Sequence, residues 1–170
     1  MKLFLIIAFS FFIQFGHGQD TLKLYALIDT FSNRTNGNEF IISESMWPGE
    51  MKRLKGALKP KIVDNSGDSI LLTNDELTYL NAQLELTDHF HWEQRLFKNA
   101  KIIPFDTLRH QRLYGQYWFF SKPIFIRDNS ICLFYYIFYC GNTCGHSQLA
   151  FYRWRNNKWT KWIHVIGGKG

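Results

Sequence analysis

Hydrophobic positions near the N-terminal end of the chain recur at helical spacing. Leu22, Tyr25, Ile28 and Phe31 follow one another at intervals of three residues. Side chains three or four positions apart lie on one face of an α-helix. The spacing therefore predicts an amphipathic helix over residues 20–32.

A second helix is predicted over residues 74–86. Leu77, Leu80 and Leu84 fall on one face. Thr73 stands before this segment, and a glutamate follows three positions later, which is the pattern of a capping box. Short apolar runs at other positions of this half, such as the one that begins at Phe40, predict short strands.

The last third of the chain has a different pattern. Between Tyr114 and His164 there are 16 aromatic residues. Runs of β-branched and aromatic residues alternate with turn residues, which is typical of a meander of short antiparallel strands. These runs cover residues 117–120, 124–127, 131–139, 148–155 and 159–165. The sequence therefore predicts an α+β fold in which N-terminal amphipathic helices pack on a C-terminal antiparallel β-meander of about 4–5 strands.

The sequence also predicts the register of the last hairpin. Asparagine tolerates positive φ, so Asn156 and Asn157 can form a two-residue turn. Such a turn places three pairs of residues opposite one another: Arg155 with Lys158, Trp154 with Trp159, and Arg153 with Thr160. The tryptophan pair is then expected to share a core face with Tyr152 and Ile163.

Residues 1–18 have the three-part pattern of a cleavable secretory signal peptide. Lys2 supplies one positive charge, an apolar run extends from Leu3 to Phe15, and small residues precede an expected cleavage before Gln19. An uncleaved N-terminal anchor is the alternative. The rest of the chain has no run of about 18 apolar residues, so no transmembrane segment is expected after cleavage. The expected localisation is secreted or periplasmic.

The remainder, residues 19–170, is expected to be a single α+β domain. Its helical part is predicted at about 19–100 and its β-meander at about 101–166. No internal repeat, low-complexity tract or long linker divides it.

Positive charge is concentrated at the C-terminal end. The whole chain has a net charge of +6, yet no acidic residue follows Asp128. The basic residues beyond that point are Arg153, Arg155, Lys158, Lys161 and Lys169. A segment of one sign favours anionic partners, such as an envelope component or an acidic glycan. The excess is modest beside the basic stripes of nucleic-acid-binding proteins, so nucleic acid is not expected. The alternative is a solvated edge that discourages strand pairing between molecules.

Three cysteines in an oxidising compartment suggest one disulfide and one free thiol. Cys132 and Cys140 are about 26 Å apart in an extended strand, because each residue advances the chain by about 3.3 Å. A disulfide needs Cα atoms within about 7 Å. The expected bridge is therefore Cys140–Cys144, which closes a small ring, and Cys132 is expected to be a buried free thiol.

Several motifs of the last third resemble a known group. They are Phe120-Ser121-Lys122-Pro123-Ile124-Phe125, Cys140-Gly141-Asn142-Thr143-Cys144-Gly145-His146 and Asn157-Lys158-Trp159. Together they resemble the C-terminal part of uncharacterised exported bacterial proteins with the pattern Phe-Ser-x-Pro-x-Phe, Cys-Gly-x-x-Cys-Gly and Asn-Lys-Trp. The resemblance covers residues 119–165. It implies an exported β-hairpin protein, and it carries no catalytic residue.

The chemical motifs leave several alternatives open. The cysteine loop could be redox-active, although its spacing differs from C-x-x-C. Zinc could bind Cys140, Cys144 and His146, or His89, His91 and Glu93, but neither set offers a fourth protein ligand. The sequence assigns no catalytic residue, metal or cofactor.

The hypothesis that follows is a non-catalytic binding or interaction module of the cell envelope. Its expected ligand-binding residues are Phe151, Arg153, Arg155 and Trp162. Aromatic side chains beside basic ones can hold anionic or sugar ligands. The alternative is a secreted hydrolase, which should join His89, His91 or His146 to a buried carboxylate.

Overall fold

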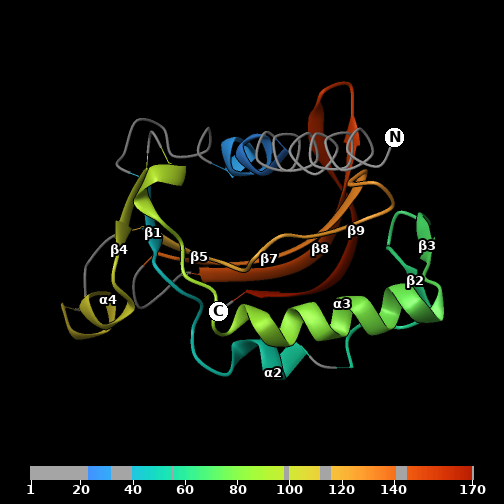
Figure 1. Ribbon diagram of the computed structural model, residues 1–170. Helices are drawn as coiled ribbons and strands as arrows, with labels where there is room; N and C mark the ends of the chain where they lie inside the picture. The colour runs from blue at the N-terminus through green and yellow to red at the C-terminus, as the bar shows by residue number, and fades with distance from the viewer. Residues whose placement is uncertain are drawn as a thin grey trace, which may run out of the picture.

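The protein is described here by a computed structural model that covers residues 23–31, 40–54, 56–97, 100–111, 116–140 and 145–169. Within these residues the fold is α+β, with a seven-stranded mixed sheet and helices on both faces (Figure 1). The expected signal peptide at residues 1–18 and the cleavage before Gln19 lie outside the described residues.

The antiparallel part of the sheet occupies the positions that the sequence predicts. Its strands are β5 (Tyr117–Phe120), β6 (Ile124–Ile126), β7 (Ile131–Tyr139), β8 (Gly145–Arg155) and β9 (Lys158–Lys169). The strand order is β5-β7-β8-β9. β5 pairs with one end of β7, and β6 pairs with the other end of the same strand.

Two further strands correct the predicted architecture, because they make the sheet mixed rather than a simple antiparallel meander. β1 (Phe40–Ser43) lies between β4 (Ala100–Ile103) and β5 and runs parallel to both. A short apolar strand cannot satisfy its backbone hydrogen bonds alone, whereas the free edge of β5 can pair with it. β1, a short strand that the sequence predicts within the mainly helical part of the chain, therefore belongs to the main sheet.

A separate two-stranded sheet was not expected. It pairs β2 (Lys61–Val63) with β3 (Ser69–Leu71) in antiparallel register. Only Ile62 and Ile70 point into the core, so each strand buries one residue between two exposed ones. A three-residue strand offers too short an alternation to be recognised from sequence.

Helices cover the two faces of the main sheet (Figure 1). Residues 23–31 are helical and lie on one face, as the periodicity predicts for that part of the segment. α2 (Glu50–Leu54) and α3 (Asn74–Thr87) lie on the other. α4 (Phe105–Gln111) follows β4, and a 3₁₀ turn, η1 (Gln94–Leu96), precedes it. None of the helices in the described part of the chain is long and apolar enough to cross a bilayer.

The capping box at the start of α3 is confirmed. Thr73 accepts a hydrogen bond from the backbone N–H of Glu76, and the Glu76 carboxylate accepts one from the Thr73 N–H. Two backbone donors at the start of the helix are satisfied in this way.

The sheet is buried on both faces, and β7 shows this most clearly. Leu133 and Tyr135 belong to the core under α2 and α3. Cys132, Phe134 and Tyr136 belong to a second core under the helix at residues 23–31. Successive side chains point to opposite faces of a strand, so an almost continuous apolar run supplies both cores.

The predicted register of the last hairpin is confirmed near its turn. Arg155 pairs with Lys158, Trp154 with Trp159 and Arg153 with Thr160. Farther from the turn the register shifts twice. Phe151 pairs with Ile163 and Tyr152 with Lys161, which leaves Trp162 as an extra residue in β9.

This bulge overturns one expectation. An extra residue reverses the alternation of the strand beyond it. Ile163 therefore lies in the core under α2 and α3, on the opposite side of the sheet from Tyr152, Trp154 and Trp159.

Candidate functional site

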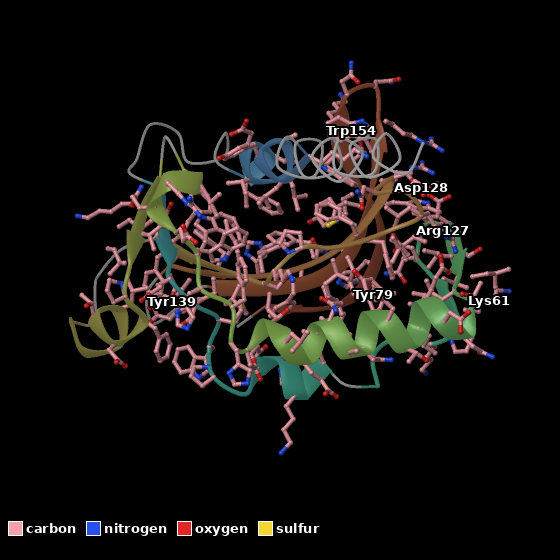
Figure 2. The ribbon with its side chains drawn as sticks, in the orientation of Figure 1. Lys61, Tyr79, Arg127, Asp128, Tyr139 and Trp154 are labelled. Atoms are coloured by element: carbon pink, nitrogen blue, oxygen red, sulfur yellow. The ribbon has the colours of Figure 1, made fainter. Side chains whose placement is uncertain are left out.

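The turn between β8 and β9 fixes the geometry of the candidate site. Asn156 and Asn157 have φ values of 49° and 58°, which are left-handed conformations that asparagine tolerates better than most residues. This turn matches the twist of the two strands. The hairpin tip extends beyond the helices that cover the sheet, and Figure 2 labels Trp154 near it.

One face of this hairpin carries an uninterrupted set of basic and polar side chains. Residues directly opposite in an antiparallel pair project from the same face, so the register places Arg155 beside Lys158 and Arg153 beside Thr160. Trp162 joins them through its contact with Arg153. We call this set the basic hairpin face: Arg153, Arg155, Lys158, Thr160 and Trp162. Trp154 and Trp159 contact each other on the opposite face, with ring centroids 5.3 Å apart.

The sequence suggested that Phe151 is a ligand-binding residue of this face, but Phe151 does not belong to its exposed part. Its side chain points to the same side of β8 as Arg153, but its exposed fraction is 0%. β8 runs from beneath the layer of α2 and α3 out to a free tip, so Phe151 lies in the covered part of the strand. It supports the site from below and cannot contact a ligand.

Arg153 and Trp162 are in direct contact on this face. The guanidinium carbon of Arg153 lies 5.1 Å from the centroid of the Trp162 ring. This geometry is a cation–π interaction. Both residues are half-buried. Two of their donor atoms, Arg153 Nε and Trp162 Nε1, are buried and have no hydrogen-bond partner among the described residues.

The cations of this face differ from Arg127, which has a carboxylate partner. Arg127, on the turn between β6 and β7, donates hydrogen bonds to both carboxylate oxygens of Glu76 at 2.7 and 3.0 Å. Among the described residues, no ion pair involves Arg153, Arg155 or Lys158. The positive charge of the basic hairpin face is therefore not neutralised within the described part of the chain.

The cysteine loop adjoins the other end of β7 and β8. Cys132 is a free thiol with an exposed fraction of 0%, and burial raises the pKa of that thiol well above its ordinary value. A buried thiol of raised pKa is unreactive. Cys144 lies outside the described residues, so the Cys140–Cys144 bridge stays a prediction.

His146 follows the cysteine loop and lies in an aromatic setting. Its ring contacts those of Trp118, Tyr136 and Phe138, with centroids 6.3, 5.4 and 5.5 Å away. The Tyr136 hydroxyl lies 3.2 Å from His146 Nε2 and donates a hydrogen bond to Gln148 Oε1 at 3.2 Å. These polar groups were not expected from the sequence, since the register of β7 on β8 is needed to bring them together.

A third polar cluster ties α2 to the sheet. The Tyr135 hydroxyl donates a short hydrogen bond to Glu50, and Arg53 Nη2 donates to the same carboxylate at 2.6 Å and to the Tyr135 hydroxyl at 3.2 Å. Burial, and then the bond to Glu50, raise the pKa of Tyr135 to about 12. The hydroxyl therefore stays protonated and serves as a donor at neutral pH.

His91 and Glu93, two members of the second candidate zinc set, take different partners. His91 Nδ1 lies 3.5 Å from a Glu44 carboxylate oxygen, with both side chains well exposed at 61% and 40%. Glu93 instead pairs with Arg95. Within the described ranges, no group of three or more His, Cys, Asp or Glu side chains is placed to hold a metal ion.

Sequence reasoning omitted two members of the basic hairpin face, Lys158 and Thr160. Their positions opposite Arg155 and Arg153 follow directly from the Asn156-Asn157 turn, so the signal was present in the predicted register. The alternation of β9 already places Trp162 on the side of Arg153, whereas no local pattern indicates the bulge that puts Ile163 opposite Phe151.

Comparison of the chain with protein-family models, with curated proteins and with solved structures finds no match. The interpretation of the site therefore depends on its own chemistry.

Proposed function

We propose that this protein is an exported, non-catalytic binding module that holds an acidic glycan on the basic hairpin face. The carrying observation is the charge of that face: Arg153, Arg155 and Lys158 share it without an ion pair among the described residues. Cations that no internal acid neutralises attract anionic ligands and fix their register.

The character of the exposed tip supports a glycan rather than a lipid bilayer as the ligand. A surface that enters a membrane presents exposed aromatic or aliphatic side chains beside its cations. Here the residues at the tip are Asn156 and Asn157, and Trp162 is half-buried under Arg153. A strand surface of arginine, lysine and threonine instead suits the carboxylates and hydroxyls of an acidic sugar chain.

The proposal is tested with polygalacturonate, a carboxylated glycan, and with dextran as the neutral comparison. The wild-type domain should bind the first and not the second, with an affinity that falls as salt is raised. The double variant Arg155→Gln/Lys158→Gln should bind about tenfold more weakly, since two exposed cations at roughly 0.7 kcal/mol each amount to about 1.4 kcal/mol.

A matched control removes the same charge elsewhere. Lys161 is exposed on the other face of the hairpin, opposite Tyr152, and Lys101 is exposed on β4 at the far edge of the sheet. The variant Lys101→Gln/Lys161→Gln should keep its affinity within about twofold of the wild type. Equal losses in both double variants would mean unspecific attraction by net charge. Binding to anionic phospholipid vesicles but not to polygalacturonate would overturn the proposal in favour of a membrane surface.

A further inference from the structure

Two residues in contact on the basic hairpin face each have a buried donor without a partner among the described residues. Among the described residues, only four buried side-chain nitrogen or oxygen atoms lack a hydrogen-bond partner: Ser43 Oγ, Asp88 Oδ1, Arg153 Nε and Trp162 Nε1. The last two belong to residues in direct contact. Buried donors in native proteins are nearly always satisfied, by protein or by something bound. Two unsatisfied N–H groups in one contact therefore indicate a missing acceptor.

The register of β8 on β9 brings the residues of these two donors together. Thr160 lies opposite Arg153, and Trp162, two positions farther along β9, points to the same side of the sheet. Trp162 is also the extra residue of a bulge, between Lys161, which pairs with Tyr152, and Ile163, which pairs with Phe151. Ile163 thus takes the place opposite Phe151 that Trp162 would hold in a regular strand, and the indole contacts Arg153.

The chemistry of the two donors selects the acceptor. A guanidinium presents Nε–H and one Nη–H as a planar fork that matches the two oxygens of a carboxylate. The indole contributes a third donor and cannot accept. An acceptor that carries a negative charge and more than one oxygen satisfies all of them, whereas a neutral hydroxyl satisfies one.

Building on the proposed function, we propose that Arg153 and Trp162 form the carboxylate subsite of the basic hairpin face. One uronate carboxylate of the glycan accepts from the guanidinium fork and from the indole N–H. The guanidinium now covers the indole, so it tilts away from the ring as the carboxylate enters. Arg155 and Lys158 attract neighbouring carboxylates along the chain.

Two conservative variants separate this subsite from simple charge. Trp162→Phe keeps an aromatic ring under the guanidinium and removes the indole N–H. Arg153→Lys keeps the charge and removes the planar fork. Each should weaken binding of polygalacturonate about tenfold, the effect of one charge-assisted hydrogen bond. Neither should change the slope of affinity against salt concentration, because the number of cations is unchanged.

A direct measurement uses the indole N–H resonance of Trp162, assigned as the one lost in the Trp162→Phe variant. On addition of galacturonate oligomers, this resonance should move downfield in a saturable manner, and it should not move in the Arg153→Lys variant. Dextran sulfate is the comparison for a tetrahedral anion. If Trp162→Phe and Arg153→Lys weaken the binding of dextran sulfate more than the binding of polygalacturonate, the assignment to carboxylate is wrong.

The failures of the two proposals are distinguishable. If the wild type does not bind polygalacturonate at all, the proposed function is wrong. If it binds and weakens in Arg155→Gln/Lys158→Gln, but binds unchanged in both Trp162→Phe and Arg153→Lys, only the carboxylate subsite is wrong. Melting temperatures of the variants identify any that fail to fold, and the resonance shift in the wild-type protein needs no variant beyond the one used for its assignment.

Discussion

Tyr135 shows what a single buried hydroxyl contributes to this fold. It lies in the core under α2, with an exposed fraction of 0%, and its hydroxyl bonds to Glu50 of that helix. Arg53 closes the cluster from the solvent side. A buried polar group is tolerated when its hydrogen bonds are satisfied, and here they also fix the position of a five-residue helix on the sheet.

Because of this hydroxyl, we expect the stability of the fold to fall at alkaline pH. The pKa of Tyr135 is raised to about 12 by burial and by Glu50, and the pKa of Tyr117 is raised to about 12 by burial. A group whose pKa is higher in the folded state contributes stability that is complete below its unfolded pKa, about 10. That stability is lost as the pH rises through about 12. We expect the free energy of unfolding, measured with urea, to decline between these values.

The variant Tyr135→Phe tests which hydroxyl is responsible. It should be less stable than the wild type at pH 8, because the Glu50 carboxylate loses a donor. Its further decline from pH 10 to pH 12 should be shallower than in the wild type. An identical alkaline decline in both proteins would show that Tyr135 titrates normally.

The cysteines supply a second prediction at this scale. Cys132 is buried and free, and burial raises the pKa of its thiol. The folded protein should not react with Ellman's reagent. After unfolding without a reductant, one thiol should react, and three should react after reduction. Three reactive thiols in the unfolded, unreduced chain would contradict the Cys140–Cys144 bridge.

Among the elements, the turn between β6 and β7 joins distant parts of the chain. Arg127, Asp128 and Asn129 all have positive φ, at 53°, 53° and 57°. The Arg127 guanidinium bonds to Glu76 of α3 and to the Leu71 carbonyl at the end of β3. Lys23 donates to the Asn129 carbonyl from the helix at residues 23–31. Figure 2 shows Arg127 and Asp128 next to each other at this junction.

Two substitutions at Arg127 separate the effect of its backbone conformation on stability from the effect of its side chain. Arg127→Gly and Arg127→Ala both remove the bonds to Glu76 and Leu71. A left-handed backbone is costly for alanine and not for glycine. Arg127→Ala should therefore be less stable than Arg127→Gly by about 1 kcal/mol in urea unfolding. Glu76→Gln leaves the turn and the bond to the Leu71 carbonyl intact, and measures the loss of the charged pair together with any weakening of the capping box. Equal stability of the two Arg127 variants would contradict a constrained turn.

The elements also show what can be predicted from sequence. The start of α3 and the β8–β9 turn are determined by residues a few positions apart, and both were correctly predicted. The parallel placement of β1 beside β4 and β5 depends on partners far along the chain. A run such as Phe40-Ile41-Ile42 indicates a strand and contains no information about its neighbour. The bulge at Trp162 likewise depends on packing, so the placement of Ile163 on the opposite face could not be predicted, although alternation alone places Trp162 on the side of Arg153.

For the whole molecule, the decisive feature is a sheet with an aromatic core on each side. Trp118, Phe120, Phe134 and Tyr136 would be exposed on one face without the helix at residues 23–31, which covers them (Figure 1). That helix is held by Trp159 Nε1, which donates to the Lys23 carbonyl at 2.8 Å. The β8–β9 hairpin thus carries the basic hairpin face on one side and anchors the helix at residues 23–31 on the other.

Phe31 is the side chain by which this helix enters the aromatic core. Its ring lies 5.0 to 6.1 Å from those of Trp118, Phe120, Phe134, Tyr136 and Tyr152. Phe31→Ala should lower the free energy of unfolding by about 3–5 kcal/mol, through lost burial and the cavity left behind. Trp47→Ala, at a site 48% exposed, is the matched aromatic control and should lose far less. If the helix is only loosely docked, the free energy of unfolding will fall by similar amounts in the two variants. Phe31 packs on the opposite side of the sheet from the basic hairpin face. Phe31→Ala should therefore leave polygalacturonate affinity unchanged while the protein is folded, which separates loss of fold from loss of site.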